Sequence, residues 1–181
     1  EAIAHLTKGL NVLSLQSAGR DRLERELALR TTLGPALMST KGLGSPEVGQ
    51  NYQRALELCR QLGQRPERFA VLRGLWEYHE LRGELKTALG LGEELFTLAE
   101  GANDPGLRLV THDVLGDTLY WCGDFTRALE HLEGGGQVTG AALLGGGQVL
   151  VVLDPNFLGY LARRQPGATA PRPRILVVDD L

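Results

Sequence analysis

The chain has 181 residues and a formal net charge of −3, with 43% hydrophobic and 23% charged residues, as is typical of a soluble globular protein. It contains no run of about 20 apolar residues that could cross a bilayer, and its N-terminus lacks the basic start and apolar core of a secretory signal. The mildly acidic charge gives no general attraction to nucleic acid or to an anionic membrane surface. We therefore expect a cytoplasmic protein with no nucleic-acid or membrane partner.

Glycine is over-represented and unevenly spread. The chain has 24 glycines, about twice the usual share of ~7%. Residues 1–133 hold 15 of them and residues 134–181 hold 9, so the shorter segment is the richer one. Such a change in composition predicts three parts: a helical-repeat domain over 1–133, a β-hairpin plus short helix over 134–164, and a linker with a truncated strand over 165–181.

Apolar residues recur at helical spacing through the first part. They predict an opening helix that contains Ala2 and Leu6, and a long helix over 20–39 that is kinked or interrupted at Gly34–Pro35. The helices that follow are marked by the apolar positions of 46–62, 67–81, 85–99, 107–121 and 125–132. We therefore expect a mainly α fold.

A 40-residue repeat organises these helices. Residues 55–89 align with 95–129 without a gap. The identical pairs are Leu58/Leu98, Arg68/Arg108, Leu75/Leu115, Gly83/Gly123, Ala88/Ala128 and Leu89/Leu129. They fall at a turn and on apolar faces, where a repeated helical hairpin needs them, so about three stacked hairpins are predicted.

Local signals place the helix ends. Gly83 and Gly123 are predicted to end a helix in the left-handed conformation, and the acid after each of them caps or faces the next helix N-terminus. The pairs Ser45-Pro46 and Asp104-Pro105 predict helix starts, because a capping side chain precedes proline at the first helical position.

Residues 1–133 resemble two kinds of helical repeat. Leu115-Gly116, Gly123-Asp124-Phe125 and Ala128 resemble the tetratricopeptide repeat, although 40 residues exceed its usual ~34. Ala2–Leu6, Leu33–Met38 with Thr40–Gly42, and Ser45–Val48 are similar to the helical-repeat region of large bacterial adenylyl-cyclase-type signalling ATPases. The resemblance implies a tetratricopeptide-like helical-hairpin solenoid that serves as a regulatory or protein-binding scaffold, and it carries no catalytic residue.

The second part has a different pattern. Residues 137–144 and 148–153 predict two strands around a glycine turn, and this hairpin is expected either to pack on the last repeat or to pair with another chain. The remaining predictions are a short helix over 156–164, a linker over 165–174, and a buried-type strand over 175–178 followed by Asp179 and Asp180.

Residues 137–155 resemble the last hairpin of the adaptor-like domain of chemotaxis-type hybrid histidine kinases, and 174–180 resemble the first strand of a receiver domain. By that resemblance Asp179 and Asp180 match the acid pair that helps to hold Mg²⁺ in receivers. The other receiver residues do not follow, so no metal site is predicted. A fused or truncated product without a selected function is one hypothesis for the two incomplete resemblances.

The preferred function is a non-enzymatic, cofactor-free interaction module of a bacterial signal-transduction (two-component) system. We expect a peptide or helix of a partner protein to bind in the solenoid groove, with Trp76, Tyr78 and Tyr120 as candidate interaction residues. For Trp76 and Trp121, helical spacing makes core packing the preferred interpretation, and a place in an aromatic binding patch is the alternative. The alternative function is a phosphorelay component that uses His5, within an H-x-x-K-G sequence, or the Asp179–Asp180 end.

Cysteines and histidines give no ligand pattern. Cys59 and Cys122 lie far apart and are expected to be reduced core thiols. His79, His112 and His131 lie on separate predicted helices and are interpreted as partly buried polar residues.

Overall fold

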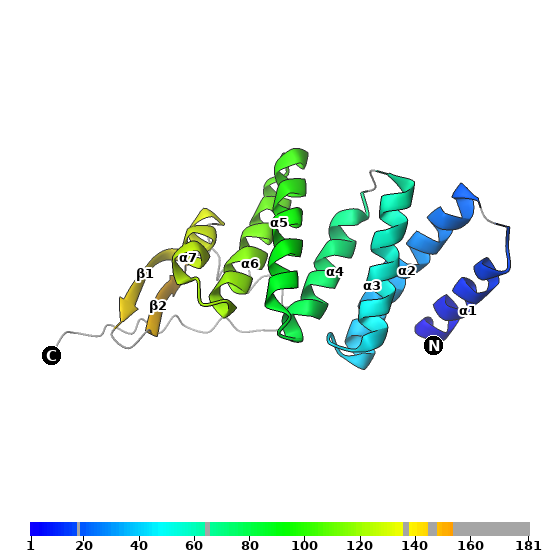
Figure 1. Cartoon of the computed structure of the whole chain (residues 1–181), viewed down its shortest axis with the longest axis horizontal. Helices are drawn as coiled ribbons and strands as arrows, with labels where there is room; N and C mark the ends of the chain where they lie inside the picture. The colour runs from blue at the N-terminus through cyan, green and yellow to red at the C-terminus, as the bar shows by residue number, and fades with distance from the viewer. Residues whose placement is uncertain (18, 64–65, 136–137, 145–147, 154–181) are drawn as a thin grey trace, which may run out of the picture.

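The computed structural model describes residues 1–17, 19–63, 66–135, 138–144 and 148–153 (Figure 1). Most of these residues form seven helices: α1 (Ala2–Ser14), α2 (Arg20–Lys41), α3 (Pro46–Leu62), α4 (Arg68–Leu81), α5 (Leu85–Ala102), α6 (Pro105–Trp121) and α7 (Phe125–Gly134). Two strands follow, β1 (Val138–Leu144) and β2 (Gln148–Leu153). The prediction of a mainly helical fold is therefore confirmed.

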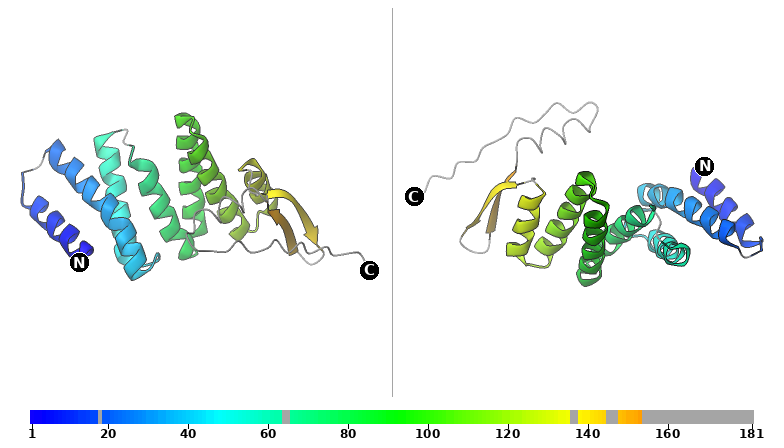
Figure 2. Two further views of the ribbon diagram at one scale, coloured as in Figure 1. Left: turned by 180° about the vertical axis from the view of Figure 1, so that it is seen from behind. Right: turned by 90° about the horizontal axis from the view of Figure 1, so that it is seen from above.

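The helices stand in a row that runs from α1 at one end to α7 and the strands at the other (Figures 1 and 2). Each helix packs against the next one along the chain, and α2 also contacts α4. The helices α2, α4 and α6 are the first members of the pairs α2–α3, α4–α5 and α6–α7. Among the described helices, none is both long and apolar enough to span a bilayer.

The turns at Gly83 and Gly123 have the same geometry. Their φ angles are +71° and +80°, in the left-handed region where a side chain would be strained. At the first turn, the Gly83 amide donates to the Glu80 carbonyl and the Glu84 amide to the His79 carbonyl, both at 2.9 Å. The amides of Gly123 and Asp124 repeat this pair of bonds, which defines a Schellman motif. The predicted helix ends at both glycines are confirmed.

The helix starts are confirmed, but only some of the predicted caps form. The Asp104 carboxylate accepts from the amides of Gly106 and Leu107 at 2.7 and 3.2 Å, and Asp124 accepts from the Arg127 amide. Ser45 makes no such bond, and its hydroxyl is buried without a partner among the described residues. Helix α3 thus begins at Pro46 without a side-chain cap.

Helix α2 continues through Pro35 to Lys41, so the predicted interruption at Gly34–Pro35 is wrong. Proline removes one backbone donor from the helix. Packing offsets this loss, since Leu33, Gly34 and Leu37 around it are all buried against neighbouring helices.

The hydrophobic core extends along the row of helices and does not form a single central cluster. One cluster of buried residues extends from Leu27 of α2 through α3, α4 and α5 to Val114 of α6. A smaller cluster of Leu115, Leu119 and Ala128 joins α6 to α7. The repeated alanines Ala88 and Ala128 are both buried at helix contacts, where a small side chain allows close approach.

Tyr52 of α3 lies between two glycines of neighbouring helices. A Cβ atom at Gly34 of α2 would lie 2.4 Å from the Tyr52 Cζ atom, and one at Gly74 of α4 would lie 2.2 Å from it. The hydroxyl of Tyr52 donates to the Met38 sulfur at 3.6 Å. The two glycines therefore leave the space that the aromatic ring fills.

Strands β1 and β2 pair antiparallel, with Ala141 opposite Val151 and Leu144 opposite Gln148. The register shifts between Val138 and Gly140, and β1 packs against α7. The predicted helix over 156–164, the linker over 165–174 and the strand over 175–178 lie outside the described residues, as do Asp179 and Asp180.

Candidate interaction surface

Trp76 is a core residue. Its side chain is 5% exposed, and its indole Nε1 donates to the Thr118 hydroxyl of α6 at 2.8 Å. The Thr118 hydroxyl in turn donates to the Val114 carbonyl at 2.8 Å. The guanidinium of Arg73 lies over the indole, 5.7 Å from the ring centroid. The structure thus places this predicted interaction residue inside the α4–α6 junction, where it offers no surface to a partner.

Tyr78 is half-buried and packs sideways onto α3. A Cβ atom at Gly49 would lie 2.4 Å from its Cζ atom. The Arg82 guanidinium lies 5.4 Å from the centroid of the Tyr78 ring, and the His79 ring meets it edge-on at 5.1 Å. Most of this ring is therefore occupied by contacts within the chain.

Tyr120 and Trp121 form an exposed aromatic pair at the end of α6. They are 45% and 61% exposed, and their ring centroids lie 5.5 Å apart in an edge-to-face arrangement. Phe125 at the start of α7 meets the Tyr120 ring at the same centroid distance. Core packing was the preferred interpretation for Trp121, and it is wrong, because the ring lies on the last turn of the helix, beyond the α4–α6 contact.

Two carboxyl groups meet beside this aromatic pair. Glu80 of α4 shares a hydrogen bond with Asp117 of α6, which lies one helical turn before Tyr120. Burial, followed by the charge and hydrogen bond of Asp117 and the charge of Glu77, raises the pKa of Glu80 to about 7. Near neutral pH the Glu80 carboxyl is therefore about half protonated.

His112 of α6 and His131 of α7 are in direct contact, although the sequence places them on separate helices. Their Nδ1 atoms lie 3.2 Å apart, and the Phe96 ring meets both imidazoles edge-on. Burial lowers the pKa of both histidines; the charge of His112 lowers the pKa of His131 further, whereas the hydrogen bond with His131 partly offsets the lowering at His112. This pair was missed because no sequence signal links residues 112 and 131.

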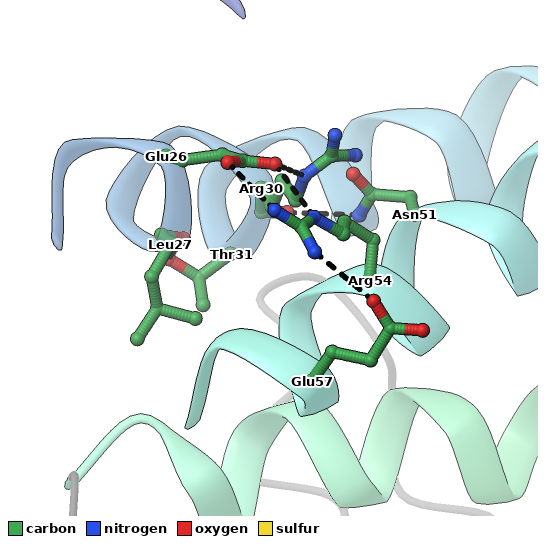
Figure 3. Close-up of polar contacts among 7 residues, drawn as sticks. All are labelled: Glu26, Leu27, Arg30, Thr31, Asn51, Arg54 and Glu57. Carbon is green, nitrogen blue, oxygen red and sulfur yellow. Dashed lines mark hydrogen bonds and ion pairs between the residues drawn. The ribbon is translucent and has the colours of Figure 1, made fainter. Parts of the chain in front are cut away.

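A charged network joins α2 to α3 (Figure 3). Arg54 places two nitrogens on the Glu26 carboxylate, at 3.0 and 3.2 Å, and Arg30 donates to it at 2.9 Å. Glu26 is buried, which alone would raise its pKa, but the two guanidinium groups outweigh burial and lower it. Arg54 also bonds Glu57, and the Asn51 amide donates to the Arg30 carbonyl at 2.9 Å. The charged groups of the network pair within the chain and close the α2–α3 contact, whereas the buried Asn51 Oδ1 has no partner among the described residues.

The remaining candidates are dispersed. His5 is exposed on α1, with its Nε2 3.7 Å from a Glu1 carboxylate oxygen. Burial is confirmed for Cys59 but is wrong for Cys122, which is exposed, and both are free thiols. His79 bonds the Glu84 carboxylate, which also accepts from Arg82. Within the part of the chain that the structure describes, no three His, Cys, Asp or Glu residues lie close enough to share a metal ion.

No family model, curated protein or solved structure matches this chain. The function therefore has to be argued from the surface itself.

Proposed function

We propose that this chain is a helical-hairpin solenoid of tetratricopeptide type and acts as a non-enzymatic scaffold that binds a segment of a partner protein. The observation that carries this proposal is the exposed pair Tyr120 and Trp121. Aromatic side chains with a polar atom are enriched at interfaces and anchor them. A bacterial signalling context follows from the sequence resemblances described above, and a cytoplasmic location from the composition.

The surroundings of the pair indicate what kind of segment would fit. The first helices of the hairpins, α2, α4 and α6, would line the groove of such a solenoid. Asp117 lies on α6 one turn before Tyr120, and Glu80 of α4 interacts with Asp117, so acidic groups lie next to this end of α6. A segment with an apolar side chain and a nearby Lys or Arg would contact the rings and this acid pair together.

The test is a peptide selection followed by quantitative binding. A displayed library of random peptides is selected on the full chain, and enriched peptides are titrated by fluorescence anisotropy. Tyr120→Ala and Trp121→Ala should each weaken binding at least tenfold, as for an interface anchor. Leu81→Ala is the matched control, because Leu81 is also exposed at the end of the equivalent helix α4.

Two results would contradict the proposal. One is the absence of enriched peptides, or peptides whose affinity is the same for the wild type and for both aromatic variants. The other concerns the phosphorelay alternative: incubation with a phosphodonor and Mg²⁺ that leaves an acid-labile label, lost in His5→Gln, would replace the scaffold by a phosphotransfer function.

A further inference from the structure

Two histidines meet nitrogen to nitrogen where α6 packs on α7. The Nδ1 atoms of His112 and His131 lie 3.2 Å apart, and the ring centroids lie 5.3 Å apart. By contrast, His5 and His79 each lie next to a carboxylate. In the α6–α7 pair, two side chains of the same, basic kind therefore direct ring nitrogens at each other.

The distance between the two nitrogens suits the ligands of a single metal ion. Bonds of about 2.0–2.1 Å from Zn²⁺ to two imidazole nitrogens, at a tetrahedral angle, put those nitrogens about 3.3 Å apart. The observed 3.2 Å differs little from this value. Metal ions bind the neutral imidazole, and burial favours the neutral form of both side chains by lowering their pKa. The two nitrogens are thus spaced for chelation without a movement of either helix.

The two rings are held in place on several sides. The Phe96 ring meets both imidazoles edge-on, at centroid distances of 5.4 and 5.7 Å. A Cβ atom at Gly134 would lie 2.7 Å from the His112 Cε1 atom and 3.1 Å from its Nδ1 atom, so the glycine leaves space beside this nitrogen. Both histidines are partly exposed, which gives water access to the pair. Fixed ligands and solvent access are what a metal site with open coordination positions needs.

Charges of both signs surround the pair. Glu100 and Glu130 favour a positive charge on the imidazoles, whereas Arg108 and Arg127 oppose it. Both arginines are themselves paired with carboxylates, at 3.7–3.9 Å. The two glutamates therefore offset part of the charge of a bound cation, and the paired arginines do not exclude it.

A link across the pair would matter because little apolar surface holds α7. Of the described residues in α7, Ala128 is the one that is buried. The cluster that joins α6 to α7 adds Leu115 and Leu119 to it, whereas the helices in the middle of the row share a much larger cluster. The histidine pair thus lies at a contact that apolar burial stabilises weakly.

We propose that His112 and His131 bind one divalent transition-metal ion, of the class of Zn²⁺, Ni²⁺ and Cu²⁺, which fastens α7 to α6. Both Nδ1 atoms are ligands, and water completes the coordination. The proton of the Nδ1–Nδ1 hydrogen bond moves to Nε2 of the same ring, so both imidazoles bind as neutral Nε2–H tautomers and no net proton is released. Imidazole suits these ions, whereas Mg²⁺ and Ca²⁺ prefer oxygen ligands. With two protein ligands instead of three or four, the ion exchanges with solvent.

This site is separate from the aromatic surface of the proposed function. Tyr120 and Trp121 lie about two turns further along α6 than His112. Peptide binding is measured with a chelator present, so each proposal can fail without the other.

The test is a calorimetric titration of Zn²⁺ into the full chain at neutral pH, after a chelator has been used and dialysed away. We expect one ion per chain. His112→Gln and His131→Gln should each weaken binding at least tenfold, because each removes one of the two ligands. Gly134→Ala should weaken it several-fold, because the methyl group fills the space beside the His112 nitrogen.

Three single substitutions are the matched controls. His5→Gln and His79→Gln each remove a histidine outside the pair, and Cys122→Ser removes the exposed thiol, which could itself bind Zn²⁺. All three should leave the affinity unchanged. Mg²⁺ should give no heat of binding, because it prefers oxygen ligands.

Hydrogen exchange of the wild type tests the link between the helices without any substitution. Saturating Zn²⁺ should slow amide exchange in α6 and α7 and leave α2 and α3 unchanged, because the ion binds the folded pair. The proposal is overturned by no binding, by equal affinity for the wild type and both histidine variants, by loss of binding in Cys122→Ser, or by protection elsewhere than in α6 and α7. A dimer that sedimentation finds only with Zn²⁺ would also overturn it, since the ion would then bridge two chains.

Discussion

Gly74 is a position where one methyl group decides the packing. A Cβ atom there would overlap the Tyr52 ring at 2.2 Å, whereas one at Gly90 of α5 would meet nothing within 4 Å. We expect Gly74→Ala to lower the free energy of unfolding by about 1–3 kcal/mol through overpacking. Gly90→Ala should raise it by about 0.5–1 kcal/mol, because alanine is the better helix former. Urea titration of both variants checks this, and equal effects would contradict the tight contact.

The sequence predicts the buried residues more accurately than the exposed ones. Helical spacing identified Val48, Ala55 and Cys59 as one apolar face, and all three are buried. It failed for Trp121, because periodicity cannot tell whether the last turn of a helix still has a neighbour. The Trp76–Thr118 bond was also out of reach, since the two residues are 42 positions apart and only the α4–α6 contact joins them.

The α6–α7 contact contains an acid-sensitive pair. Because burial lowers the pKa of His112 and His131, and the charge of His112 lowers that of His131 further, the folded state binds fewer protons than the unfolded state. The stability that the pair contributes is present above the ordinary value of about 6.5 and is lost as the pH falls below it. The neighbouring charges act in both directions: Glu100 and Glu130 favour protonation, and Arg108 and Arg127 oppose it.

We therefore expect the stability difference between wild type and His131→Gln to shrink as the pH falls from 7.5 to 5. Chemical denaturation at several pH values measures it. Asn11→Gln on α1 is the control, because it changes no titratable group, and its difference from wild type should not change with pH. A difference that is constant for His131→Gln would contradict the prediction.

The α4–α6 contact responds to pH in the opposite direction. The raised pKa of Glu80 means that the folded state holds a proton that the unfolded state releases, so this contribution is full below pH 4.5 and is lost as the pH rises through about 7. Glu80→Gln keeps a hydrogen-bond donor toward Asp117 without the charge. We expect this variant to gain stability relative to wild type as the pH rises from 5 to 8, measured by the same titrations.

The existence and order of the helices could be predicted from sequence, because 40-residue spacing, proline starts and glycine ends all agree. The sequence did not predict that α2 continues as a helix through Pro35, nor which side chains contact each other between helices. Those depend on contacts between neighbouring hairpins, such as Tyr52 between Gly34 and Gly74, which have no local signature.

In a row of helices, a destabilising substitution at one end should affect only nearby helices, because each helix packs mainly against its neighbours. Leu13 is the only buried residue of α1, whereas Leu72 of α4 is fully buried near the middle of the row. Hydrogen exchange should show faster exchange in α1 and α2 alone for Leu13→Ala. Leu72→Ala, with a cost of about 2–5 kcal/mol, should speed exchange on both sides of α4. Uniform acceleration by Leu13→Ala would instead indicate one fully cooperative unit.

The ion pair of Glu26 with Arg54, and the charge-reversed pair of Arg68 with Glu94 forty residues further, bear on how the chain assembles. Repeats of similar shape can pair with the wrong neighbour during folding or exchange helices between molecules. If α2 docked one hairpin too far along, Glu26 would face Glu94, and if α4 docked one hairpin too early, Arg68 would face Arg54. Both errors bring like charges together, so the charge at this position of α3 and α5 favours the correct pairing of α2 and α4 over the wrong one.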